Sequence, residues 1–135
     1  MRSLKVLILE HNPFQLMALH QMLNAMGIYD VLTAPTLDSA LRSLGHRGAV
    51  DIAICDPQHE GGDGVALIRH LSQRQQAHAL ILVGRASPRL LKGLDFILLE
   101  HELRLLGRLQ TPVSAVLMRS LVDDYLLSSR RAASV

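Results

Sequence analysis

The chain has 135 residues, the size of one domain, and is 49% hydrophobic but only 3% aromatic, which predicts an aliphatic core of the kind found in layered α/β proteins. No apolar run approaches the roughly 18 residues of a membrane-spanning helix, and residues 1–10 are too short and end too acidic for a signal peptide. The net charge is only +2, the basic residues are scattered, and two Tyr and two Phe cannot build a stacking platform, so we expect no membrane insertion and no nucleic-acid binding.

Short apolar runs alternate with segments of helical period along the chain. The runs predict strands over 6–9, 30–34, 52–55, 80–83 and 103–109. Helices are expected between and after them. In chain order, they are a helix from Pro13, capped by Asn12, to Gly27; a helix from Leu37, capped by Thr36, to Gly45; a helix capped by Asp63; a helix opened by Pro88; and a helix over 113–127.

Five strand–helix pairs with short connections indicate a parallel sheet with right-handed crossovers. The working site of such a sheet lies at the carboxyl ends of its strands. This rule brings together Glu10 and His11, Asp56, residues 83–84 and residues 110–111. Residues 1–127 form the predicted domain, and residues 128–135 are expected to be a polar tail or the start of a linker.

Several common functions lack their motifs in this chain. The first strand–helix turn, Glu-His-Asn-Pro, has none of the glycines of a dinucleotide-binding turn, and no P-loop is present. No nucleophile–base pair is recognisable, so we expect no enzymatic activity. The single cysteine, Cys55, cannot form an internal disulfide, which favours a cytoplasmic location, and inside an apolar strand it is expected to be a core residue.

The pattern around the third strand is more specific. Asp51, an apolar run and Asp56 are followed by Asp63-Gly64 at the start of a helix. In this order and spacing the chain resembles the receiver domain of bacterial response regulators in two-component signalling. The resemblance implies a flavodoxin-like, doubly wound, five-stranded parallel sheet of order 2-1-3-4-5 with helices on both faces. The segment 87–112 most resembles receivers that precede EAL-type cyclic-di-GMP phosphodiesterase domains.

The same resemblance implies a function and a site. Asp56 would be the phosphoacceptor, modified by a histidine kinase or a phosphotransfer protein. Mg²⁺ would be held by Glu10, by Asp56 and by the backbone carbonyl of Gln58, while His11, in place of the second acidic residue, would be a poor Mg²⁺ ligand. Phosphorylation would then modulate the interaction with an output domain or another effector.

Two further positions depart from the receiver pattern. The hydroxyl residue that ends the fourth strand is replaced by Gly84, or by Val83 if the register shifts by one, and the lysine before the fifth-strand proline is replaced by Thr111. With Glu10 and Asp56 ionised and no lysine, the pocket keeps a formal charge of about −2, which suits Mg²⁺. The groups that would read the phosphoryl group are missing, so we expect a weakened switch.

Two other interpretations stay open. The chain is a pseudo-receiver that binds partners without being phosphorylated, or His11 and Asp56 give a pH- or metal-dependent switch, with His11 and His59 beside Asp56 and Glu10 as candidate Zn²⁺ ligands. Surplus apolar residues on the last two helices, among them Phe96, Leu99 and Tyr125, predict an interaction surface and possible homodimerisation.

Overall fold

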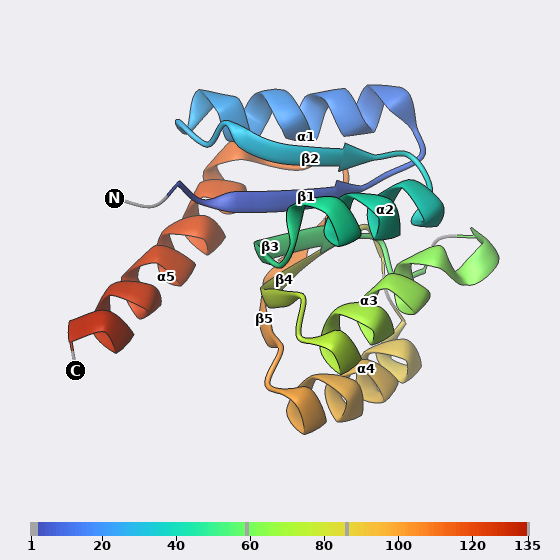
Figure 1. The fold of residues 1–135 in the computed structure, drawn as a ribbon. Coiled ribbons are helices and arrows are strands. Elements are labelled where there is room, and N and C mark those ends of the chain that lie inside the picture. The colour runs from blue at the N-terminus through green and yellow to red at the C-terminus, as the bar shows by residue number, and fades with distance from the viewer. Residues whose placement is uncertain (1–2, 59, 86, 135) are drawn as a thin grey trace.

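The computed structural model of the chain describes residues 3–58, 60–85 and 87–134. In this part of the chain five parallel strands form one sheet in the order β2-β1-β3-β4-β5 (Figure 1). The strands are β1 (Lys5–Leu9), β2 (Asp30–Ala34), β3 (Val50–Cys55), β4 (Ala77–Val83) and β5 (Arg104–Leu109). The α-helices are α1 (Pro13–Ala25), α2 (Leu37–Arg47), α3 (Asp63–Arg74), α4 (Pro88–His101) and α5 (Ala115–Ser134), and a short 3-10 turn, η1 (Glu60–Gly62), precedes α3.

The predicted doubly wound α/β fold is therefore confirmed, including the strand order. Each predicted strand is present, and the bounds differ by at most a few residues at the amino ends of β1, β3, β4 and β5. The apolar runs located the strands well because β3 is buried along its whole length and β4 along nearly all of it. Strands covered on both faces read as continuous apolar sequence.

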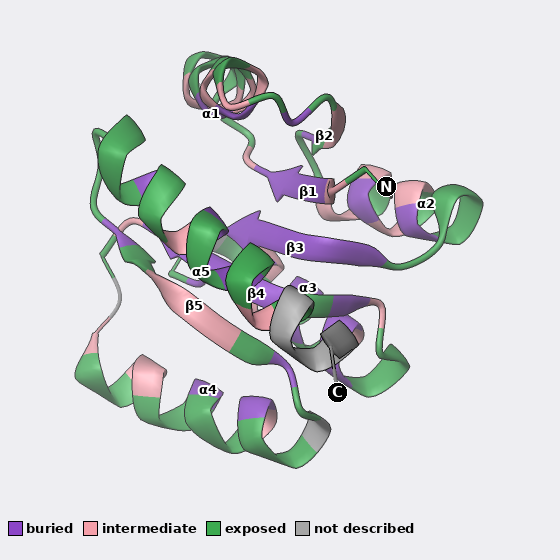
Figure 2. Cartoon of the chain, turned by 90° about the vertical axis from the view of Figure 1, so that its left-hand side faces the viewer, coloured by how far each residue is buried: buried purple, intermediate pink, exposed green. Residues whose placement is uncertain are grey.

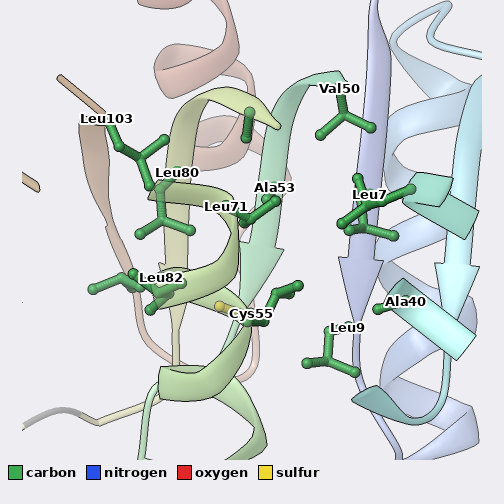
Figure 3. Close-up of a cluster of buried hydrophobic side chains, with 14 of the residues drawn as sticks. Leu7, Leu9, Ala40, Val50, Ala53, Cys55, Leu71, Leu80, Leu82 and Leu103 are labelled. Carbon is green, nitrogen blue, oxygen red and sulfur yellow. The ribbon is translucent and has the colours of Figure 1, made fainter. Parts of the chain in front are cut away.

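Helices cover both faces of the sheet (Figure 1). On one face, side chains of α2, α3 and α4 pack against β1, β3 and β4, and Figure 3 shows part of this cluster, from Leu7 on β1 through Cys55 on β3 to Leu82 on β4. On the other face α1 and α5 pack against alternate residues of the same strands, such as Ile8, Ile54 and Ile81. Burial is greatest in the central strands, whereas the edge strand β5 is mostly half-buried (Figure 2).

Local signals set most of the helix starts. The Asn12 side chain accepts hydrogen bonds from the backbone N–H groups of Phe14 and Gln15, so its predicted role as the cap of α1 is confirmed. Thr36 and Ser39 form a reciprocal capping box at the start of α2. Ser87 caps α4 through a hydrogen bond from Leu90 N–H.

Several helix boundaries differ from the prediction, and three of the differences have a clear local reason. Helix α2 passes through Gly45 and ends at Arg47, before Gly48, whose φ of 78° suits glycine. Asp63 does not cap α3, because Gly62, in the left-handed region at φ 75°, holds the cap position and Asp63 is the first helical residue. Helix α5 continues to Ser134 instead of giving way to a polar tail after Leu127, since no Gly or Pro interrupts this stretch.

Among the helices in the described part of the chain, none combines the length and the apolar character required to span a bilayer.

Candidate functional site

Asp56 follows β3 directly and stands, half-buried, at the carboxyl edge of the sheet. Its Oδ1 atom accepts a hydrogen bond of 2.9 Å from the backbone N–H of Gln58. This bond is local and fixes the orientation of the carboxylate, because the donor lies only two residues along the chain. The other oxygen, Oδ2, is directed toward the end of β4, where it lies close to Gly84.

Glu10 and His11 follow β1 at the same edge. The Glu10 backbone N–H donates to Ala34 O at 3.0 Å, which extends the pairing of β1 with β2 by one residue. Its Oε1 atom accepts a hydrogen bond of 3.1 Å from the Asn12 N–H and lies 3.9 Å from Nδ1 of His11. The carboxylate of Glu10 is mostly buried, with 13% of the side chain exposed, whereas the His11 side chain is 56% exposed.

A small cavity of about 20 Å³ lies between these residues, lined by Leu9, Glu10, His11, Pro35, Asp56, Asp63 and Gly64. Three of the lining residues are acidic. The sheet thus brings together Glu10, His11 and Asp56 as predicted from the carboxyl-edge rule. Asp63 was expected to serve only as a helix cap. Its distance along the sequence from Asp56 did not indicate that it lines the cavity.

Gly64 explains why Asp63-Gly64 follows Asp56 at this spacing. A Cβ atom on Gly64 would meet the carbonyl oxygen of Asp56 and would stand 2.8 Å from its carbonyl carbon and 2.9 Å from Cα of Pro57. Helix α3 therefore packs directly on the backbone of Asp56, and only glycine allows this approach.

Gly84 and Val83, the two candidates for the hydroxyl position, lie at the end of β4. Val83 is the last, buried residue of β4, and Gly84 follows it with φ at 97°. A Cβ atom on Gly84 would lie 2.7 Å from Oδ2 of Asp56. Gly84 therefore does more than lack a hydroxyl group, because with this backbone no side chain fits between residue 84 and Asp56. Thr111, at the other substituted position, is exposed and precedes Pro112 through a cis peptide bond.

Gln58 connects two loops at this edge. Besides its N–H bond to Asp56, its side-chain Oε1 accepts a hydrogen bond of 3.1 Å from the backbone N–H of Ser87, the cap of α4. Gln58 is not among the residues that line the cavity, and the ligand role of its carbonyl stays a prediction. His59, named as a candidate Zn²⁺ ligand, lies outside the described residues.

Metal binding depends on how many donors the site offers. Within the described residues, which do not include the candidate ligand His59, no group of three or more His, Cys, Asp or Glu side chains is placed to hold a metal ion; zinc sites generally use three or four such ligands. Mg²⁺ differs, because it keeps several waters and is commonly bound by one or two carboxylates together with a phosphate. One oxygen of Glu10 is held by the backbone N–H of Asn12, which leaves its other oxygen for such an ion.

Cys55 lies on β3 beside the site and is completely buried among aliphatic residues (Figure 3). Burial, and secondly the charge of Asp56, raise the pKa of its thiol to about 12. A thiol that is neutral at physiological pH does not act as a nucleophile or metal ligand. The prediction of a structural core residue agrees with this environment.

The sequence did not reveal a basic area at the same edge. Arg85 follows Gly84, and Arg108 lies near the end of β5, where it pairs in register with Leu82 of β4. Together with Gly84 and Gln110 they line a depression of about 480 Å³. The two arginines are 23 positions apart in the sequence, so only the pairing of β4 with β5 shows that they are neighbours.

The predicted interaction surface is partly corrected. Phe96 and Leu99 on α4 are 79% and 82% exposed, as expected of such a surface. Tyr125 is not part of it, because it is only 7% exposed and its hydroxyl donates a 3.0 Å hydrogen bond to Oδ1 of Asp51. Because apolar residues surround much of α5, the sequence did not show that its aromatic residue, Tyr125, faces inward.

The fold and the acidic carboxyl edge together define a receiver-type signalling domain, and solved structures support the fold. The signal receiver domain of an HD domain-containing protein from Pseudomonas fluorescens Pf-5 is similar with a TM-score of 0.77 at 21% identity, over 96% of this chain and 99% of that one. The N-terminal domain of a response regulator/sensory box/GGDEF 3-domain protein from Carboxydothermus hydrogenoformans matches with a TM-score of 0.75 at 20% identity, over 96% and 98% of the two chains.

Residues 6–94 match the model of the response regulator receiver domain family, and the chain belongs to this family. It is a family of two-component signalling domains and not of enzymes. The chain is also 34% identical, over 125 residues, to the cyclic di-GMP phosphodiesterase RocR of Pseudomonas aeruginosa. The match covers 93% of this chain but only 32% of RocR, so the chain spans about a third of that relative's length. The predicted similarity to phosphodiesterase-linked receivers is confirmed by this match.

Proposed function

We propose that the chain is the receiver of a phosphorelay response regulator and that Asp56 accepts a phosphoryl group in a Mg²⁺-dependent reaction. One observation carries the proposal: Asp56 and Glu10 line the same cavity at the carboxyl edge of the sheet, and Asp56 is oriented by the Gln58 N–H so that Oδ2 is left for reaction. In this family, receiver domains generally bind Mg²⁺ in an acidic pocket.

The proposed reaction is a transfer from a phosphohistidine of a kinase or phosphotransfer protein. Oδ2 of Asp56 attacks the phosphorus, an O–P bond forms and the P–N bond breaks. The electron pair of the broken bond stays on the imidazole nitrogen, which takes up a proton. Bringing an anionic phosphoryl group to a carboxylate is opposed by their like charges. Mg²⁺ held by Glu10 and Asp56 would offset that repulsion by neutralising charge.

The natural partners belong to the same proposal. The similarity to RocR supports a cyclic-di-GMP phosphodiesterase output domain or effector, because the aligned region of RocR is a receiver-sized part of a much longer protein. The exposed Phe96 and Leu99 support a contact of α4 with an output domain or with a second copy of the chain. The proposal also places the protein in the cytoplasm, because its single cysteine is a free thiol and reduced thiols are typical of that compartment.

The decisive experiment is incubation with acetyl phosphate and Mg²⁺, followed by intact mass spectrometry. We expect a gain of one phosphoryl group that disappears in Asp56→Asn and on chelation of Mg²⁺. Asp124→Asn, which changes an exposed carboxylate on α5, is the matched control and should be phosphorylated normally. If no mass gain occurs with acetyl phosphate, phosphoramidate or a phosphohistidine donor, the proposal is wrong.

A second function is favoured by one observation, the contact of Gly84 with Asp56. Without the hydroxyl that reads the phosphoryl group, the domain would act as a phosphorylation-independent interaction module. This alternative predicts that neither Asp56→Asn nor phosphodonor treatment changes partner binding, whereas the phosphorelay function predicts that phosphodonor treatment changes the binding of the wild type but not that of Asp56→Asn. A pull-down of the partner with and without acetyl phosphate separates the two.

A further inference from the structure

The depression beside Asp56 is lined by Gly84, Arg85, Arg108 and Gln110. Arg108 and Gln110 are two residues apart in extended or nearly extended chain, which directs their side chains to the same face. Leu109, between them, packs on the side of α1 and α5. Arg108 and Gln110 therefore belong to the face of the sheet that α2, α3 and α4 cover.

Gly84 connects this depression to the phosphoacceptor. Its N–H donates a 2.9 Å hydrogen bond to Leu109 O, which holds the ends of β4 and β5 together. On its other side, the position of a missing Cβ is 2.7 Å from Oδ2 of Asp56 but 3.2 Å from Oδ1, the oxygen already bonded to Gln58. The free oxygen of Asp56 thus faces Gly84, and no side chain of residue 84 separates it from the depression.

The charges on the two sides of Asp56 are opposite. Glu10 and Asp63 line the acidic cavity, whereas Arg85 and Arg108 line the depression. Both arginines are exposed, and neither makes an ion pair within residues 3–58, 60–85 and 87–134. An arginine guanidinium presents a planar fork of donors that matches phosphate oxygens, and such charge-assisted pairs are stronger than neutral hydrogen bonds.

We propose that Arg85 and Arg108, with the amide of Gln110, bind the phosphoryl oxygens of phosphorylated Asp56 and supply the positive charge that is missing at Thr111. The inference rests on the proposed function of Asp56. It assigns the phosphoryl-reading role to residues at the carboxyl ends of β4 and β5. Because the two arginines come from different segments, their binding to one phosphoryl group would draw the loop after β4 toward β5.

The test compares phosphorylation of the wild type with that of Arg85→Gln, Arg108→Gln and the double variant, using acetyl phosphate and Mg²⁺. Arg104→Gln is the matched control, because it removes the same charge from the opposite end of the same strand, β5. We expect the phosphorylated fraction at steady state to fall by about tenfold in the double variant, equivalent to one charge-assisted hydrogen bond. Arg108→Lys, which keeps the charge but loses the fork, should lie between Arg108→Gln and the wild type.

A merely structural role is excluded by thermal unfolding, since exposed Arg→Gln changes should leave the melting temperature near that of the wild type. Equal phosphorylation of the wild type, the double variant and Arg104→Gln would overturn this inference and leave the proposed function intact. An equal loss in Arg104→Gln would also overturn it, because it would reflect total charge. A wild type that gains no phosphoryl group would instead reject the proposed function, and the inference with it.

Discussion

The buried Asp51 offers the most direct test of the packing of α5 on the sheet. Its carboxylate is 3% exposed and accepts hydrogen bonds from the backbone N–H of Lys5 at 2.8 Å and from the Tyr125 hydroxyl at 3.0 Å. His78 lies within 3.6 Å of the same carboxylate. Replacing Tyr125 with Phe removes the hydroxyl, which donates to Asp51 and also lies 3.2 Å from Nδ1 of His78, and leaves the ring in place.

Hydrogen bonds to charged groups contribute about 1.5–3 kcal/mol when one partner is removed from a buried pair. We therefore expect Tyr125→Phe to lower the free energy of unfolding by about 2 kcal/mol, which corresponds to a fall in melting temperature of roughly 5–10 °C for a domain of this size. Urea denaturation followed by circular dichroism gives both the midpoint and the m-value, and only the midpoint should change.

Tyr29→Phe is the matched control, because Tyr29 is 76% exposed and is the only other tyrosine of the chain. Its free energy of unfolding should stay within about 0.5 kcal/mol of the wild type. The reasoning is refuted if the two variants are equally stable. A double-mutant cycle with Asp51→Asn should show a coupling energy above about 0.5 kcal/mol if the two side chains interact directly.

Three further predictions concern the site. Gly64→Ala should destabilise the domain by about 1–3 kcal/mol in urea, because its Cβ meets the backbone of Asp56, whereas Gly93→Ala on α4, with open space around it, should be neutral or stabilising; equal effects would contradict this packing. Gly84→Ser should lower the free energy of unfolding by about 1–3 kcal/mol and reduce phosphorylation by acetyl phosphate, without restoring the switch. The reason is that φ of residue 84 is 97° and the added Cβ stands 2.7 Å from Oδ2 of Asp56. A variant that is as stable as the wild type and better phosphorylated would disprove this prediction. Cys55, with its pKa raised to about 12 by burial and by the Asp56 charge, should resist iodoacetamide at neutral pH until urea unfolds the chain. Its contribution to stability should be present below about pH 8.5, the ordinary thiol pKa, and should be lost as the pH rises toward 12, so Cys55→Ala should flatten alkaline urea titrations, and rapid native alkylation would contradict the argument.

The sequence was most informative about features that depend on neighbouring residues, such as buried apolar strands and side-chain caps of helices. The buried strands β3 and β4 read as apolar runs, and Asn12 and Thr36 marked helix starts through side-chain caps that depend only on nearby residues. The location of Glu10, His11 and Asp56 at one edge followed from the parallel sheet alone.

Features that depend on distant residues were less accessible. Tyr125 bonds to Asp51 across 74 positions of sequence, and a helix with apolar residues around much of its girth does not show which of them face inward. The neighbourhood of Arg85 and Arg108 depends on the register of β4 with β5, which includes a shift between Leu80 and Ile81. Asp63 was misplaced because a glycine in the left-handed region, Gly62, starts the helix one residue earlier.

Two carboxylates, one near the start of β3 and one directly after its end, are held in different ways. Asp51 and Asp56 are five residues apart in sequence, about 16 Å along a strand at 3.3 Å per residue. Asp51 ties the base of the strand to β1 and α5 through the Lys5 N–H and the Tyr125 hydroxyl, whereas the hydrogen bond that Asp56 accepts from Gln58 joins it to its own loop. The hydrogen bonds of Asp51 therefore hold the base of β3 to neighbouring elements, whereas a change at Asp56 acts first on the loop that contains Gln58.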